Sequence, residues 1–398
     1  MTSFSSNETR AVSMLATLYV VRMLGLFMVL PLIAIYSADL TGATPFLLGL
    51  AVGAYGLTQA SLQIPMGWLS DRIDRRLVII LGLSMLTLGS VVAAMSSSIW
   101  GVIFGRFLQG AGAIASATMA LVADYTREEQ RAKASAIIGG SIAIAFGIAL
   151  VLGPVLASVG GLQMVFATTA CLAVMGVAVV FFLPKPQRFE REAQADGSGF
   201  QRSRLAQVLS IPSLNLMYLS IFFLHLTLMA VFVVVPTSLQ TEAGIALEHH
   251  ALVYLGALLL SVPGIYWLVK GRRYMDRPIA SLLQCLGVLF LGVLLLSVGD
   301  WAPTLSGLCL FFTGFTALEA MLPSLASIYA PASARGTAMG VFASSQFIGV
   351  FIGGLMGGAL LDIVGAFGVW LGMALVTLIW GMLLSLSRLA SPETVAAR

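Results

Sequence analysis

Twelve apolar runs of about twenty residues or more, separated by short polar breaks, dominate this sequence. An α-helix rises about 1.5 Å per residue, so a run of about 20 apolar residues crosses the hydrocarbon core of a bilayer. The runs lack the two-residue alternation of barrel strands. Since only helices and closed barrels satisfy every backbone group in lipid, we predict an all-α membrane protein with twelve transmembrane helices. The predicted spans are 13–36, 46–69, 77–96, 99–122, 134–158, 162–183, 212–236, 250–269, 278–298, 302–326, 336–360 and 364–387.

Composition agrees with a membrane environment. The 398 residues are 59% hydrophobic and 10% charged, and the mean hydropathy is +0.99. Soluble domains average about 25% charged residues. The three cysteines lie inside apolar runs, which indicates free thiols. The N-terminal segment lacks the basic region and cleavage site of a signal peptide, so we expect it to be retained.

The spans form two groups of six. We predict an N-terminal half at 1–183, a polar linker at 184–211 and a C-terminal half at 212–398. A faint repeat supports this division. At an offset of 204, three residues of the first half match residues of the second: Gly110 with Gly314, Arg131 with Arg335, and Gly161 with Gly365. Internal symmetry of this kind is typical of secondary transporters.

Basic residues fix the predicted orientation. Two of the 21 Lys and Arg residues, Arg22 and Arg106, lie inside spans. The other nineteen fall on one side if both termini are cytoplasmic, as the positive-inside rule requires. We therefore predict a multi-pass protein of the cell (inner) membrane with cytoplasmic termini. The basic balance is explained by topology, and no clustered basic face with stacking aromatics indicates a nucleic-acid partner.

Three motifs carry a family resemblance. They are a charged loop after the second span (Gly67, Asp71, Arg72, Arg75 and Arg76), GRFLQGAGA at 105–113, and the pair Gly153–Pro154 in the fifth span. The chain resembles the major facilitator superfamily, whose loop reads G-x-x-x-D-R-x-G-R-R, and is most similar to its YajR-like branch of proton-driven transporters. That resemblance implies two six-helix halves and a helix-shaping role for Gly153 and Pro154. Two departures are Asp74 at the loop's last glycine position, and a chain that ends soon after the twelfth span.

The charged loop is a candidate conformational latch. Asp71 and Arg75 are four residues apart and can pair on a helical turn, and Asp124 offers Arg75 a second carboxylate. The partial positive charge of a helix N-terminus near Gly336 would attract Asp71. The resemblance implies that this arrangement holds the two halves in the outward-open state and breaks in the inward-open one. The alternative is a topogenic loop in which Arg72 and Arg76 face anionic lipid.

Four ionisable residues lie deep inside predicted spans: Arg22, Arg106, His225 and Glu319. Such groups are costly in lipid and mark functional interiors by default. The resemblance implies that their four spans line a central cavity. Burial disfavours the charged form of Glu319, and histidine titrates near neutrality, so we expect a transported proton on Glu319, shared with His225. The alternative is a set of satisfied interhelical bonds, such as Arg106 with backbone carbonyls.

Together these features predict a proton-coupled exporter of a lipophilic or amphipathic small molecule that works by alternating access. The alternatives are a proton-coupled importer with Arg22 or Arg106 gripping an anion, and a non-transport scaffold or sensor. No P-loop or catalytic cluster indicates an enzyme. His249–His250 lacks further ligands, so no metal is expected. The expected partners are the substrate, protons and membrane lipids, the expected energy source is the proton gradient with no cofactor, and the expected state is a monomer.

The orientation can be tested by cysteine accessibility in intact cells. A Gly197→Cys variant, in the linker, should resist an impermeant thiol reagent added outside and react after permeabilisation. A Glu248→Cys variant, in a loop predicted to face outward, should react from outside and serves as the matched control. Labelling of Gly197→Cys from outside would refute the assignment.

Overall fold

The computed structural model describes residues 4–184, 202–270, 276–331 and 334–389, and these residues are almost entirely helical. The first half holds α1 (Ser6–Met28), α2 (Leu30–Ile33), the 3₁₀ turn η1 (Ile35–Asp39), α3 (Pro45–Arg72), α4 (Arg75–Ala94), α5 (Ile99–Ala111), α6 (Ala115–Tyr125) and α7 (Glu128–Phe181). The second holds α8 (Arg202–Leu209), α9 (Pro212–Thr241), η2 (Leu247–His249), α10 (His250–Val269), α12 (Pro278–Leu296), α13 (Trp301–Tyr329), α14 (Arg335–Val364) and α15 (Ala366–Leu386).

The long element α7 is two spans joined at a sharp bend. It covers 54 residues, and the backbone leaves the helical region at Gly160 and Gly161. Gly161 has φ +65°, a conformation that glycine adopts without strain. The described residues hold eleven apolar helices long enough to cross a membrane, and the bend in α7 makes twelve crossings. The predicted twelve-helix class and the break before residue 162 are therefore confirmed.

Two local differences from the expected spans have simple causes. The first helix begins at Ser6 because Ser5 and Glu8 form a capping box, in which each side chain binds the other residue's backbone N–H. Part of the expected linker is helical, since α8 covers Arg202–Leu209 and buries Val208. Residues 185–201 of that linker lie outside the described residues.

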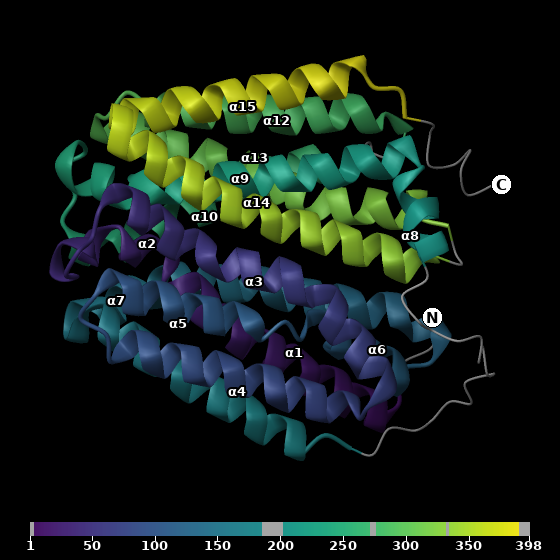
Figure 1. Cartoon of the computed structure of the whole chain (residues 1–398). Coiled ribbons are helices and arrows are strands. Elements are labelled where there is room, and N and C mark those ends of the chain that lie inside the picture. Colours follow the sequence, from purple (N-terminus) through teal and green to yellow (C-terminus); the bar gives the residue numbers. More distant parts are fainter. Residues whose placement is uncertain (1–3, 185–201, 271–275, 332–333, 390–398) are drawn as a thin grey trace.

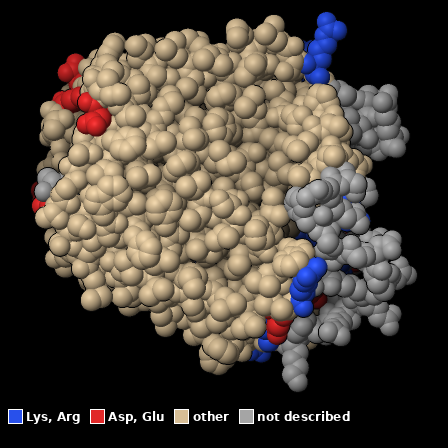
Figure 2. Space-filling model, in the orientation of Figure 1, with Lys and Arg blue, Asp and Glu red and all other residues tan. Residues whose placement is uncertain are grey.

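The helices of the two halves form two groups that lie against each other along their length (Figure 1). One end of the bundle, on the right in Figure 1, holds the start of α1, the end of α15 and α8; we call it the terminal face, and its counterpart the opposite face. In the view of Figure 2, charged side chains lie at these two ends, with uncharged surface between them. That band fits the apolar interior of a bilayer.

The halves meet through a glycine-rich contact between α3 and α14 near the opposite face. A Cβ added at Gly49 would lie 2.2 Å from the carbonyl oxygen of Gly354, and one added at Gly354 would lie 2.6 Å from the carbonyl oxygen of Gly49. No side chain fits between the two backbones there. Toward the terminal face the situation is reversed, since a Cβ at Gly336 or Gly340 of α14 would meet nothing within 4 Å. The two halves are therefore packed backbone to backbone at the opposite face.

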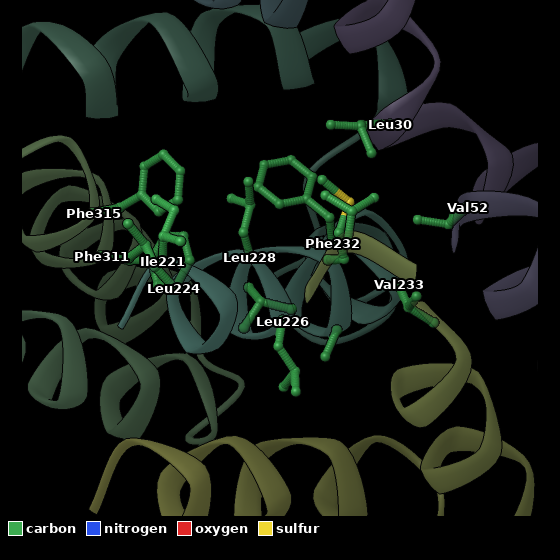
Figure 3. Packing of buried hydrophobic residues seen from close by; sticks show 14 of the residues in the cluster. Leu30, Val52, Ile221, Leu224, Leu226, Leu228, Phe232, Val233, Phe311 and Phe315 are labelled. Carbon is green, nitrogen blue, oxygen red and sulfur yellow. The ribbon is translucent and has the colours of Figure 1, made fainter. Parts of the chain in front are cut away.

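The central helix of the second half is α9, which is buried on all sides along its middle. Twenty of its residues are buried, including the run from Leu224 to Pro236. Figure 3 shows its side chains projecting in several directions, with Leu30 and Val52 of the first half on one side and Phe311 and Phe315 of α13 on another. An element that is apolar all round belongs in the interior of a bundle, and here it lies between other helices rather than in lipid.

The backbone supports the predicted internal repeat. Gly161 (φ +65°, ψ −164°) and Gly365 (φ +81°, ψ −171°) adopt nearly the same conformation, and each separates two consecutive spans. These two positions are 204 residues apart. The equivalent turns of the two halves are therefore built in the same way.

The α3–α14 contact predicts opposite outcomes for two identical substitutions in one helix. Gly→Ala raises helix propensity at either site, but at Gly354 the added methyl group would overlap the backbone of Gly49 and Gly53. Overpacking of this kind costs about 1–3 kcal/mol. Gly354→Ala should lower the thermal unfolding midpoint in detergent, whereas Gly340→Ala should leave it unchanged or raise it. Equal midpoints for the two variants would contradict the close approach.

Candidate functional site

A polar cluster lies inside the second half, where His225 of α9, Glu319 of α13 and Gln346 of α14 meet. The amide nitrogen of Gln346 lies 2.8 Å from Nε2 of His225 and 3.4 Å from Oε1 of Glu319. Nε2 of His225 lies 3.7 Å from Oε2 of Glu319. The structure thus brings together the two residues that the sequence singled out for the proton, and it adds Gln346.

The hydrogen bonds of His225 indicate its tautomer. Nδ1 lies 3.3 Å from the carbonyl oxygen of Ile221, which can only accept a hydrogen bond, so Nδ1 carries a proton. Nε2 then accepts from the amide of Gln346. The imidazole is neutral in this arrangement, and both of its ring nitrogens are used, with Oε2 of Glu319 3.7 Å from Nε2.

Glu319 is the open member of the cluster. Its side chain is 37% exposed, yet Oε2 is buried and accepts no hydrogen bond from any described residue. The ring of Phe315 stands edge-on to His225, with the centroids 5.7 Å apart. An acceptor without a donor in apolar surroundings is costly, and binding a proton or a hydrogen-bond donor would relieve that cost.

A second cluster lies inside the first half, around Arg22. Its Nη2 donates to the hydroxyl of Tyr55 at 3.1 Å and to Oε1 of Gln59 at 3.0 Å. Gln59 in turn donates to Gln63 at 2.9 Å. Nη1 of Arg22 is buried and has no hydrogen-bond partner among the described residues. Arg22 is therefore a buried cation whose described hydrogen-bond partners are neutral.

Arg106 is also enclosed by neutral groups. It donates to the carbonyl oxygens of Ala51 and Val52 at 3.3 and 3.5 Å and to Oε1 of Gln109 at 2.9 Å. Its guanidinium carbon lies 5.2 Å from the centre of the Tyr55 ring. Only 1% of Arg106 is exposed. These hydrogen bonds to backbone carbonyls of α3 are the alternative that the sequence left open for Arg106.

The four deep ionisable residues therefore form two clusters, one in each half, and their place on a central cavity stays a prediction. Three aromatic ring pairs cross between the halves near them. The rings of Tyr55 and Phe347 are 6.1 Å apart, and Phe146 of α7 lies 6.1 Å from Phe312 and 6.4 Å from Phe315. Tyr55 touches both arginines of the first cluster, and Phe347 follows Gln346 of the second.

In the predicted latch, Arg75 is bound within the first half. Its Nη1 lies 2.6 Å from Oδ2 of Asp124 and 2.9 Å from the carbonyl oxygen of Ala120. This ion pair joins α4 to α6. Asp71 lies in the last turn of α3, but its side chain is outside the described residues, so its part in the latch stays a prediction. The N-terminus of α14 has open space at Gly336.

The remaining loop residues differ in their surroundings. Arg76 donates to the hydroxyl of Tyr125 at 2.6 Å and to the carbonyl oxygen of Pro184, so protein groups hold it in place of the expected lipid. Arg72 is exposed and stacks on Trp68, with 3.8 Å to the ring centre. Asp74 has φ −58° and caps α4 by accepting from the N–H of Arg76. At the position where the resembling loop has a glycine, Asp74 thus needs no positive φ, and its carboxylate serves as an N-cap.

The pair in the fifth span shapes a helix contact. A Cβ at Gly153 would lie 2.6 Å from the carbonyl oxygen of Met28, so α1 and α7 touch through their backbones there. Pro154 follows inside α7. A side chain at Gly153 would push the two helices apart, which supports the helix-shaping role that the resemblance implies.

Two kinds of residue in these contacts were not predicted from the sequence. Glu8 is 2% exposed and binds Arg127 through three hydrogen bonds of 2.9–3.1 Å, which tie α1 to the start of α7. The capping-box spacing of Ser5 and Glu8 could have revealed this helix start. The other kind is the uncharged amide, as at Gln346 and Gln59, which a search for charged groups passes over.

Two further features bear on ligands. Among the described residues, no group of three or more His, Cys, Asp or Glu side chains could hold a metal ion. An open cavity of about 320 Å³ lies at the opposite face, between the end of α9, the turn before α13 and the start of α15. It is lined by Glu242, Ser297, Val298, Gly299, Asp300, Ala366, Phe367 and Trp370. This cavity shares no residue with either polar cluster.

Comparisons with known proteins agree on one family. The profile of the Major Facilitator Superfamily matches residues 15–349. The inner membrane transport protein YajR of Escherichia coli (strain K12) is 41% identical over 376 residues, which cover 94% of this chain and 82% of that protein. The multidrug resistance protein MdtH of Salmonella newport (strain SL254) is 26% identical over 345 residues, which cover 85% and 83%. The predicted resemblance is confirmed.

Solved structures share the fold at low identity. A D-xylose–proton symporter has a TM-score of 0.78 at 13% identity, with 98% of this chain and 99% of that one covered. The human organic anion transporter MFSD10 has a TM-score of 0.70 at 21% identity, with 95% and 99% covered.

The ion pair in the charged loop gives a test with a matched control. Asp124→Asn removes one charged partner of Arg75, whose side chain is 10% exposed, so the thermal midpoint and transport should both fall. Asp74→Asn removes one negative charge from the same loop but keeps a good N-cap residue, so it should behave like the wild type. Equal thermal midpoints and equal transport in the two variants would show that the Arg75–Asp124 ion pair contributes no more than another negative charge in the same loop.

Proposed function

The chain belongs to the Major Facilitator Superfamily and is a secondary transporter, and we propose that it exports a lipophilic or amphipathic small molecule in exchange for protons. The observation that carries this proposal is the cluster of His225, Glu319 and Gln346. It places a carboxylate with an unbonded oxygen deep in an apolar bundle, beside a neutral imidazole. A group of this kind can gain and lose a proton during a transport cycle.

The way the halves touch supports a mechanism of alternating access. They are packed backbone to backbone near the opposite face, while α14 has open space at Gly336 and Gly340 toward the terminal face. If the termini are cytoplasmic, this is a conformation closed to the outside. Rocking of one half against the other would then expose Glu319 to each side in turn. Protons would enter from outside and substrate would leave, with the proton gradient as energy source and no cofactor.

The surroundings of Glu319 support an apolar substrate. Phe315 lies beside His225, and Phe146 and Phe312 continue the aromatic surface across the two halves. Such a surface binds hydrophobic and aromatic groups, and one carboxylate fixes orientation. The similarity to a protein named for multidrug resistance agrees with this substrate class. Substrate and proton would compete for the same carboxylate, which is the basis of exchange.

A second candidate function is proton-coupled uptake of an anionic metabolite. The buried Nη1 of Arg22 has no partner among the described residues, and it could bind an anion once the first half opens. The solved structure named as an organic anion transporter shares the fold. We favour export because Glu319 is 37% exposed in this conformation, whereas Arg22 is 2% exposed.

The proton role of Glu319 can be tested in proteoliposomes with an imposed pH gradient and a panel of lipophilic dyes. Glu319→Gln keeps the shape but cannot ionise, so gradient-driven accumulation of a transported dye should be lost while downhill exchange continues. Glu248→Gln, at an exposed position outside the cluster, is the matched control and should accumulate dye normally. Normal accumulation with unchanged pH dependence in Glu319→Gln would leave Glu319 with a structural role alone.

A further inference from the structure

Gln346 occupies the point between the two groups that would exchange the proton. Its amide nitrogen lies 2.8 Å from Nε2 of His225 and 3.4 Å from Oε1 of Glu319. An amide NH₂ group has two hydrogens. One therefore points to the imidazole and the other to the carboxylate.

This use of both hydrogens requires that the single lone pair of Nε2 on His225 is available to the amide. Glu319 can accept at Oε1 both as a carboxylate and as an acid protonated at Oε2. If a proton arrives at Nε2, the new N–H faces an NH₂ group, and two donors then oppose each other. A proton on Oε2 of Glu319 faces Nε2 across 3.7 Å and would compete with the amide for the same lone pair. In either case the amide loses its acceptor at Nε2, and turning the amide presents its oxygen, which is the acceptor end of the group.

Gln346 also lies at the interface between the halves. It precedes Phe347 in α14, whose ring meets that of Tyr55 at 6.1 Å with an interplanar angle of 64°. A Cβ at Gly56 would lie 2.6 Å from the carbonyl oxygen of Phe347, so α3 and α14 touch at this level. Tyr55 in turn holds Arg22 by a hydrogen bond and lies against Arg106. A change at Gln346 therefore occurs one residue away from the contact between the halves.

We infer that Gln346 is a positioning residue that couples the proton carried by His225 and Glu319 to the α3–α14 interface. When the proton binds, the amide turns, α14 adjusts against α9, and the contact of Phe347 with Tyr55 is altered. This inference rests on the proposed proton coupling. It specifies how protonation in the second half changes the contact with the first half. The proton stays on His225 or Glu319 throughout, because an amide does not titrate.

The test needs no substrate. In liposomes, infrared difference spectroscopy follows the carboxyl band that disappears in Glu319→Gln, and it reports proton binding as a function of pH. In a background without the three native cysteines, spin labels at Gly140→Cys and Gly336→Cys report the distance between the halves near the terminal face. In the wild-type background, both signals should change with the same midpoint.

Gln346→Met keeps the size of the side chain but has no donor. Without the two N–H groups that favour bare Nε2 and ionised carboxylate, the midpoint of the carboxyl band should move to higher pH by about one unit. The distance between the labels should no longer follow pH. Phe347→Leu leaves the cluster intact, so the band should keep its midpoint while the distance change becomes smaller. Gln346→Asn retains an amide and should restore part of the distance response.

Three results would overturn the inference. They are a full distance response in Gln346→Met, an unchanged carboxyl midpoint in that variant, or a wild-type distance that does not follow pH. Loss of dye accumulation in Glu319→Gln would still support proton coupling in each of these cases, so a failure of the inference and a failure of the proposed function can be told apart.

Discussion

The close approach of α3 and α14 determines how a structural change in one half can reach the other. Small residues let helix backbones touch inside a membrane, where apolar surface gains little from leaving lipid. Gly49 and Gly354 make this contact near the opposite face, and it brings Tyr55 within reach of Phe347. The cluster of the first half and that of the second are thereby connected through two aromatic rings. A wider separation would leave two polar sites without a common contact.

The two halves share a backbone plan but bury different chemistry. Gly161 and Gly365 make equivalent turns in the same conformation. The first half buries two guanidinium groups among amides, a tyrosine and backbone carbonyls, whereas the second buries a carboxylate and a neutral imidazole. Buried charge is costly unless it is bonded. Among the described residues, the hydrogen bonds of each cluster lie within its own half, so neither cluster depends on the other half for them. Nη1 of Arg22 and Oε2 of Glu319 have no partner among the described residues.

Hydropathy and charge were sufficient to predict the spans, the break before residue 162 and the pairing of His225 with Glu319 in one half. They failed for Glu8, which lies before the predicted first span at 13–36, although its spacing from Ser5 forms a capping box. They also failed for Gln346, since an uncharged amide leaves no signal in a charge pattern. That Arg106 bonds to the carbonyls of α3 depends on packing between distant segments, which a single sequence does not specify.

The two halves bury different charged groups, and this difference bears on which half begins a conformational change. In the proposed cycle, a proton that binds in the second half changes the charge of the His225–Glu319 pair and leaves the two arginines of the first half unchanged. Since α14 carries both Gln346 and the interface residue Phe347, the helix that would sense the proton is also the helix that packs against α3. Motion could then begin in the second half without any change of charge in the first. The arginines would act as a fixed positive background, against which the charge of the His225–Glu319 pair distinguishes the two states of the cycle.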